Sequence, residues 1–205
     1  MIKHHLNTAA DNKPVYLFDY DGTLSDASHR LDKLPTKDPH LTESWSEFNR
    51  LSAYDGAIES TIQVMNGLFN SGAFVIILTG RSDEVCEIST QWLHDAGAKY
   101  NVMVMRQASD NRKDIIIKEE FLRYIGLHRI TAAWDDSPNV IAHLRSLGVT
   151  TYAVVDYAGS ERSDLKSHGV DELKPECNHT WVRHDIVGND YYEVCISCGK
   201  SRGIK

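Results

Sequence analysis

The sequence predicts an open α/β fold, in which helices cover both faces of a parallel β-sheet, followed by a small C-terminal module. Short, nearly continuous apolar runs indicate strands that are buried on both faces. Longer amphipathic stretches separate these runs, as expected of crossover helices. The 205 residues are 41% hydrophobic and 25% charged, which suits one packed domain and a small appendage rather than two large domains.

Five strands and four intervening helices are expected in alternating order. The strands are predicted at Val15–Asp19, Phe74–Thr79, Asn101–Met105, Ile130–Trp134 and Thr150–Val155. The helices are predicted at Ala57–Phe69, Ser82–His94, Lys113–Ile125 and Pro138–Leu147. Each helix is followed by a glycine, at Gly72, Gly97, Gly126 and Gly148, where helix C-caps are expected.

Two segments depart from this alternation. Ser25–Asp55 contains prolines and scattered charges and is expected to form a small insertion over the end of the first strand. After Asp156 the pattern fades into a polar linker, and a cysteine-rich tail begins near Pro175. The predicted organisation is an N-terminal extension (1–13), a main domain (14–156, with the insertion at 25–55), a linker (157–174) and a small module (175–205).

The composition limits the class of protein. No apolar run approaches the ~18–20 residues of a membrane-spanning helix, and the N-terminus has no apolar signal-peptide core. We therefore expect a cytoplasmic protein without a membrane partner. The net charge of −7 argues against a protein that coats nucleic acid through a general positive field. The excess of acids outside the tail fits either a metal site or an acidic surface.

The first candidate site follows the first predicted strand, in the segment Asp19-Tyr-Asp21-Gly-Thr-Leu24. Active sites of open α/β sheets lie at the carboxyl ends of the strands. Two carboxylates one residue apart can face one site once the chain turns, and Gly22 permits that turn. The simpler alternative is an Asp-Gly turn with a solvated acid.

The later strand ends extend this pattern, and together the motifs resemble the haloacid dehalogenase (HAD) superfamily, whose first motif reads hhhhDxDGTL. The second motif corresponds to Thr79-Gly80-Arg81, the third to Lys118 on a helix, and the fourth to Asp135-Asp136. Taken singly, these residues also fit a helix cap, a solvated lysine and an acid pair at a helix N-terminus. The resemblance implies a Rossmann-like sheet with a small cap insertion.

A closer resemblance, over residues 14–156, is to the 3′-phosphatase domain of phage-type polynucleotide kinase-phosphatase. In that group an Arg ends the third strand, an Asp follows eight residues later and the motif-three Lys four residues after that, as do Arg106, Asp114 and Lys118. An essential Arg lies eleven residues past the first aspartate, where this chain has Arg30. No G-x-x-x-x-G-K-[ST] loop is present, so kinase activity is not predicted.

The resemblance implies a two-step phosphatase mechanism. Asp19 is expected to attack phosphorus and form an aspartyl-phosphate, while Asp21 protonates the leaving group and then activates water. Lys118 and Thr79 are expected to stabilise the phosphoryl group. Mg²⁺ is expected on Asp19, the main-chain carbonyl of Asp21, and the pair Asp135 and Asp136. Substrate binding is assigned to Arg30, Gly80, Arg81, Arg106 and Asp114.

The substrate is expected to be a nucleotide or a nucleic-acid 3′ end, because the insertion is too short to enclose a small metabolite. Trp45 and Phe48, also assigned to substrate binding, can stack on a base or anchor the insertion. Removal of 3′-phosphates from nucleic-acid ends is the leading hypothesis, and a (deoxy)nucleoside monophosphatase of the 5′-nucleotidase type is the alternative. A non-catalytic nucleic-acid-binding module is the contrasting class, and the intact acid, lysine and threonine set argues against it.

The tail carries a predicted structural zinc site formed by Cys177, His179, Cys195 and Cys198. Val182–Val194 is expected to form a hairpin about Gly188-Asn189, and zinc would supply the stability that so small a module lacks. A disordered tail with incidental cysteines is the alternative. The module is expected either to guide a nucleic-acid strand or to dock on the main domain or a second subunit. The fourth cysteine, Cys86, is predicted to be a small buried side chain.

Overall fold

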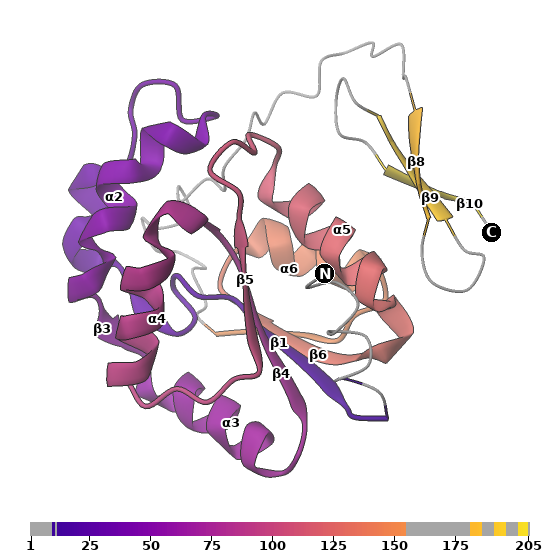
Figure 1. Ribbon diagram of the computed structural model, residues 1–205, viewed down its shortest axis with the longest axis horizontal. Helices are drawn as coiled ribbons and strands as arrows, with labels where there is room; N and C mark the ends of the chain where they lie inside the picture. Colours follow the sequence, from indigo (N-terminus) through magenta and orange to yellow (C-terminus); the bar gives the residue numbers. More distant parts are fainter. Residues whose placement is uncertain (1–9, 11, 155–180, 186–190, 196–200, 205) are drawn as a thin grey trace.

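The computed structural model describes residues 10, 12–154, 181–185, 191–195 and 201–204. Its centre is a parallel five-stranded sheet with the order β5-β4-β1-β6-β7 (Figure 1). The strands are β1 (Val15–Phe18), β4 (Phe74–Ser82), β5 (Val102–Arg106), β6 (Ile130–Asp135) and β7 (Thr151–Ala153). This arrangement confirms the predicted parallel α/β sheet.

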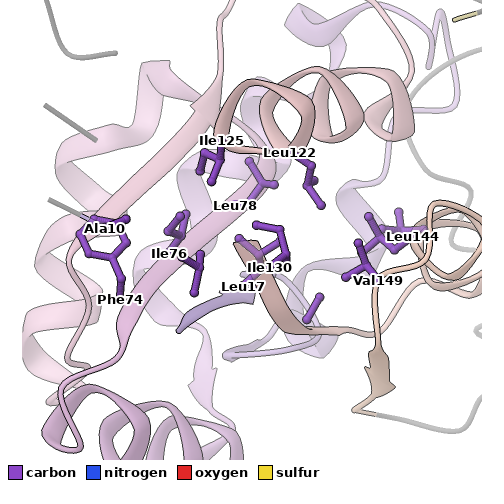
Figure 2. Close-up of a cluster of buried hydrophobic side chains, with 13 residues drawn as sticks. Ala10, Leu17, Phe74, Ile76, Leu78, Leu122, Ile125, Ile130, Leu144 and Val149 are labelled. Atoms are coloured by element: carbon purple, nitrogen blue, oxygen red, sulfur yellow. The ribbon is translucent and has the colours of Figure 1, made fainter. Parts of the chain in front are cut away.

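Helices cover both faces of this sheet (Figure 1). They are α3 (Glu59–Asn70), α4 (Cys86–Asp95), α5 (Asp114–Ile125) and α6 (Pro138–Ser146). Alternate residues of the central strands divide between two cores. Leu17, Ile76 and Leu78 pack with residues of α5 and α6, including Leu122 and Leu144 (Figure 2).

The opposite face of the same strands carries Phe18, Val75 and Ile77, which pack with residues of α3 and α4 such as Met65 and Leu93. Every residue of β4 from Phe74 to Thr79 is buried. The central strands are therefore buried on both faces, which is why their sequences show no polar alternation.

The insertion is framed by two short antiparallel strands, β2 (Ser25–Asp26) and β3 (Gly56–Ala57). Between them lie η1 (Ser28–Lys33), η2 (Thr42–Trp45), α2 (Ser46–Arg50) and η3 (Leu51–Tyr54). Ala27, Trp45 and Phe48 form a small core of its own. Thr42 joins the insertion to the loop after β5, since its N–H and Oγ1 donate to Asn111 Oδ1 and to the Asp110 carbonyl at 2.7 and 2.6 Å.

The expected helix at Ser82–His94 begins later than predicted, because β4 continues to Ser82 and is followed by η4 (Asp83–Val85). The hydroxyl of Ser82 accepts from the N–H of Glu84 and so caps this first turn. The prediction that Cys86 is buried is wrong. Cys86 is exposed because α4 turns Ser89, Trp92 and Leu93 toward the core instead.

A second, three-stranded sheet lies near the C-terminus and consists of β8 (Trp181–Asp185), β9 (Tyr191–Cys195) and β10 (Ser201–Ile204). The antiparallel pairing of β8 with β9 confirms the expected hairpin, and β10 was not predicted. Cys177, His179 and Cys198 lie outside the described residues, as does the side chain of Cys195, so the zinc site remains a prediction. Within the described part of the chain, no helix has the length and apolar character needed to cross a membrane.

Candidate active site

The candidate site is a cavity of about 130 Å³ at the carboxyl edge of the parallel sheet. The ends of β1, β4 and β6 form its floor, and α5 and the insertion supply its walls. All four residues predicted to be catalytic, namely Asp19, Asp21, Thr79 and Lys118, line it. So do Gly80, Arg81, Asp114, Asp135, Asp136, Trp45 and Phe48 from the predicted site. Arg30 and Arg106 are absent from its lining.

Lys118 links the acids of the floor. Its Nζ lies 2.7 Å from Asp19 Oδ1, 2.9 Å from Asp135 Oδ2 and 3.3 Å from Asp114 Oδ2. Asp114 begins α5 and Lys118 follows one turn later, so both side chains point to the same side of the helix. Burial lowers the pKa of Lys118, but the three carboxylates more than offset it and hold the pKa well above its usual range. These carboxylates therefore favour the charged, ammonium form of Lys118.

Asp19 occupies a crowded negative environment. Burial raises the pKa of this carboxyl group, the ammonium group of Lys118 opposes the shift, and the nearby acids Asp135 and Asp136 reinforce it. The net result is a pKa well above the ordinary value. A group with this environment gains from a second positive charge beside it.

Three carboxylates fit a divalent cation. Asp19, Asp135 and Asp136 each offer an oxygen, and these oxygens lie within 4.8 Å of one another. Asp136 reaches this position because Gly22 has no side chain: a Cβ there would stand 2.1 Å from Asp136 Oδ2, and the φ angle of Gly22 is +75°. Carboxylate oxygens are the ligands that Mg²⁺ prefers, so the donor set fits the predicted ion.

Asp21 has the opposite surroundings. Arg30 Nη2 lies 2.6 Å and Arg81 Nη2 2.5 Å from Asp21 Oδ1, and Arg81 Nε donates to Oδ2 at 3.1 Å. Removal from water raises the pKa of Asp21, but the two guanidinium groups outweigh it and hold the pKa well below its usual range. Arg81 faces the cavity, while Arg30 lies beneath it and stacks on the Phe48 ring at 3.9 Å.

Asp55 completes this group, and the sequence analysis did not identify it. Its Oδ1 accepts from Arg30 Nε at 2.7 Å, and its Oδ2 accepts from Arg30 Nη2 at 2.6 Å and from Ser25 Oγ at 3.0 Å. Arg81 Nη2 lies 3.4 Å from the same Oδ2. The Asp55 side chain is fully buried. Two guanidinium groups and two carboxylates therefore form a neutral cluster at the base of the insertion.

Arg106 is placed differently from the prediction that it binds substrate. It is completely buried and donates to main-chain carbonyls at Gly80 (2.9 Å), Asp110 (3.1 Å) and Arg112 (2.5 Å). Its Nη2 lies 3.6 Å from Asp114 Oδ1. The structure thus makes Arg106 a support for β4, for the loop after β5 and for Asp114.

Asp114 packs closely on Gly80. A Cβ at Gly80 would meet Asp114 Oδ1 at 2.3 Å, so this glycine is needed for the approach of α5 to β4. Thr79 precedes it with a side chain only 3% exposed, and its Oγ1 accepts the Arg81 N–H at 3.1 Å. All three residues of the predicted second motif, Thr79, Gly80 and Arg81, line the cavity as expected.

Trp45 and Phe48 form part of the insertion's own small core and also line the cavity. Their rings pack edge to face with centroids 5.8 Å apart, and Trp45 Nε1 donates to the Pro39 carbonyl at 2.9 Å. Both side chains are largely buried, at 9% and 6% exposure. The two rings therefore pack inside the insertion, and both anchoring of the insertion to the sheet and stacking on substrate remain hypotheses.

A parallel α/β sheet with an aspartate-lysine pair, a second aspartate and an acid pair at its carboxyl edge defines a phosphatase of the HAD type. A family model described as the polynucleotide kinase PNKP phosphatase domain matches residues 13–158. The chain belongs to this family. A comparison with curated proteins gave no match.

Solved structures agree. Two structures of the Pnkp1/Rnl/Hen1 complex, one of them described as an RNA repair complex, contain chains that are 28% and 26% identical to this protein. Each match covers 70% of this protein and has a TM-score of 0.55. The match covers 43% and 47% of those chains, so this chain spans less than half of each. A putative phosphatase from Clostridium difficile, 14% identical over 70% of this chain and 85% of that one, has a TM-score of 0.51 and shows the fold alone.

Proposed function

We propose that this phosphatase removes 3′-phosphates from nucleic-acid ends in a Mg²⁺-dependent reaction through an aspartyl-phosphate. The observation that carries the reaction type is the placement of Asp19: it lies at the cavity floor, 2.7 Å from Lys118 and beside two further acids. A carboxylate so placed can face phosphorus, and the lysine offsets the repulsion between the two anions.

In the first step, an oxygen of Asp19 forms a bond to phosphorus as the bond to the 3′-oxygen of the sugar breaks. Asp21 gives its proton to that departing oxygen. In the second step, Asp21 takes a proton from water, the water oxygen bonds to phosphorus, and the bond from phosphorus to Asp19 breaks. The products are a 3′-hydroxyl end and inorganic phosphate, and both aspartates return to their starting state.

Mg²⁺ would be held by Asp19, Asp135, Asp136 and the main-chain carbonyl of Asp21. When bound, it supplies positive charge that the phosphoryl group and the acids of the floor share. Thr79 offers a hydroxyl donor at the cavity wall, and Lys118 keeps the Asp19 oxygen oriented.

The assignment of a nucleic-acid end is supported by three observations. The family is the phosphatase domain of a polynucleotide kinase, and the similar solved chains belong to an RNA repair complex. The cavity, of about 130 Å³, is too small to enclose a whole nucleotide, which suits a substrate that extends beyond it. A free nucleotide carries the same phosphate ester and base, so a (deoxy)nucleoside monophosphatase is the alternative outcome of the test.

The test compares phosphate release from a 3′-phosphorylated oligonucleotide, the same oligonucleotide phosphorylated at its 5′ end, and deoxynucleoside monophosphates, each with Mg²⁺ and with EDTA. We expect the 3′-phosphorylated strand to be preferred and EDTA to abolish turnover. Asp19→Asn is expected to be inactive, whereas Asp95→Asn, at an exposed position of α4, is the matched control. Near-normal turnover by Asp19→Asn refutes the mechanism, and a preference for free nucleotides refutes the substrate assignment.

The tail is proposed to bind one structural zinc ion through Cys177, His179, Cys195 and Cys198. In support, β9 ends at Cys195 and pairs with both β8 and β10, so one proposed ligand terminates the central strand of a small antiparallel sheet. Elemental analysis of protein purified without chelator is expected to give one zinc per chain. Unchanged metal content and melting temperature in Cys195→Ser contradict the proposal.

A further inference from the structure

The insertion contributes six residues to the cavity, and only one of them is polar. The apolar ones are Ala27, Leu31, Leu34, Trp45 and Phe48. The sixth is Asn49, on helix α2. The cavity therefore has a charged floor that suits a phosphoryl group and a mostly apolar wall with a single amide. A substrate that is held by its phosphate places its esterified group against this wall.

Asn49 is unusual because the nitrogen of its side-chain amide lacks a hydrogen-bond partner within the described residues. The residue is 2% exposed, and its Nδ2 is buried without a hydrogen-bond partner among the residues that the structure describes. Buried polar groups are almost always hydrogen-bonded, because burial removes the hydrogen bonds that water supplied. Asn49 lines the cavity, but its Nδ2 is closed off from solvent, so an unpaired donor here is explained if the amide turns toward a bound molecule that provides the acceptor.

The other buried atoms without partners do not combine an unpaired donor with a place in the cavity wall. Arg106 Nη2 and Asp114 Oδ1 face each other at 3.6 Å and attract as opposite charges. Thr23 and Ser52 have buried hydroxyl groups without partners, but neither residue lines the cavity. Asn49 alone, within the described residues, combines an unpaired donor with a place in the lining of the cavity.

We infer that Asn49 is a specificity-determining residue, which donates a hydrogen bond to an acceptor oxygen of the terminal nucleoside when the substrate fills the cavity. This inference rests on the proposed function, since it takes the esterified group to be a nucleoside. A buried donor that only a nucleoside can satisfy disfavours phosphate esters of simple alcohols and phenols, because these leave the amide unpaired. The residue binds substrate but takes no part in proton transfer.

The test uses Asn49→Leu, which keeps the size and shape of the side chain and removes its polar atoms, with Asn49→Ala as a second variant. Ser52→Ala is the matched control, because it removes a buried unpaired hydroxyl of the same insertion that does not face the cavity. Each protein is assayed on a 3′-phosphorylated oligonucleotide and on phenyl phosphate, which lacks any nucleoside acceptor, and its melting temperature is measured.

We expect Asn49→Leu to lose about tenfold or more in kcat/KM on the strand, mainly through a higher KM, because one hydrogen bond is lost there. On phenyl phosphate the change is expected to stay within about twofold. The melting temperature of this variant is expected to be unchanged or higher, since removing an unpaired buried donor removes a cost of folding. If Asn49 were only structural, its replacement would lower the melting temperature and would reduce activity equally on both substrates.

Equal losses on both substrates, or no loss on the strand, overturn the inference. A lower melting temperature for both Asn49 variants, with Ser52→Ala unaffected, also overturns it, because the amide would then have a structural partner. Failure of the proposed function looks different. In that case the unsubstituted enzyme itself shows no preference for the 3′-phosphorylated strand over phenyl phosphate, and the role of Asn49 falls with it.

Discussion

Removing the charge of Asp55 tests the neutral cluster that holds Asp21. In Asp55→Asn one oxygen becomes an NH₂ group, and both oxygens of the native carboxylate accept from Arg30. Whichever way the amide of the new asparagine turns, its NH₂ group therefore faces an N–H donor of Arg30. Two buried guanidinium groups are then left with the single carboxylate of Asp21. Breaking a buried ion pair by removing one partner costs about 3–5 kcal/mol.

This cost translates into a large shift of the melting temperature. About 1 kcal/mol corresponds to roughly 2–4 °C for a protein of this size, so we expect Asp55→Asn to melt about 6–20 °C lower. Thermal unfolding followed by circular dichroism measures the shift. Asp32→Asn is the matched control: Asp32 lies in the same insertion and pairs with Lys33, but its side chain is 69% exposed. Its expected effect is within about 0.5 kcal/mol.

Activity is expected to fall as well, because the arginines that position Asp21 lose their own support. A misplacement of about 1 Å in a catalytic group lowers kcat by about 10²-fold. The loss is measured below the melting temperature of the variant, so that unfolding does not contribute. If Asp55→Asn has the same melting temperature as the unsubstituted protein, the cluster contributes no net stability and the reasoning from buried charges fails.

Three further predictions follow from close contacts in the site. Gly22→Ala is expected to displace Asp136 and weaken Mg²⁺ binding in calorimetric titrations, whereas Gly148→Ala, with a similar φ of +83° and nothing within 4 Å, costs stability alone. Asp19→Asn is expected to raise the melting temperature in EDTA at neutral pH, because the raised pKa of Asp19 means that its charged form destabilises the fold. This gain in melting temperature is expected to shrink as the pH falls toward about 4, where the carboxyl group is protonated in the folded protein as well. An unchanged melting temperature at pH 7 contradicts this prediction. Thr42→Val removes the hydroxyl donor to the loop after β5 and is expected to lower the free energy of unfolding in urea by about 1 kcal/mol. It is also expected to speed proteolysis of the insertion. Equal proteolysis rates refute the idea that the hydrogen bond from Thr42 holds the insertion against this loop.

The fold and the floor of the site could be predicted from the sequence because both depend on local patterns. Strands buried on both faces produce continuous apolar runs, and their carboxyl ends meet at one edge of a parallel sheet. Asp19, Thr79 and Asp135 follow or end such runs, so their convergence was predictable from strand order alone. The structure places all three in one cavity.

The rest of the site depends on contacts that no short pattern encodes. Asp55 meets Arg30 only after the insertion has folded back through β2 and β3, and an isolated aspartate at the end of an irregular segment carries no periodic signal. The motif spacing identified Arg106 but not the direction of its side chain, which points to carbonyls of the neighbouring loop instead of the cavity. For Cys86, helical position, not hydrophobicity, determines exposure.

The two aspartates of the first motif have environments that oppose their proposed roles, and this contrast indicates what substrate binding must change. The pKa of Asp19, the proposed nucleophile, is raised by burial and by the neighbouring carboxylates, and the pKa of Asp21, the proposed acid, is lowered between two arginines. Arg81 faces the cavity, whereas Arg30 is tied to Asp55 beneath it. We therefore expect a phosphate dianion in the cavity to compete with Asp21 for Arg81 rather than for Arg30. Weakening of that contact would raise the pKa of Asp21, so that the carboxyl group could hold the proton that the leaving oxygen needs. Arg30 would keep Asp21 oriented meanwhile, so we expect the two arginines to have separate tasks.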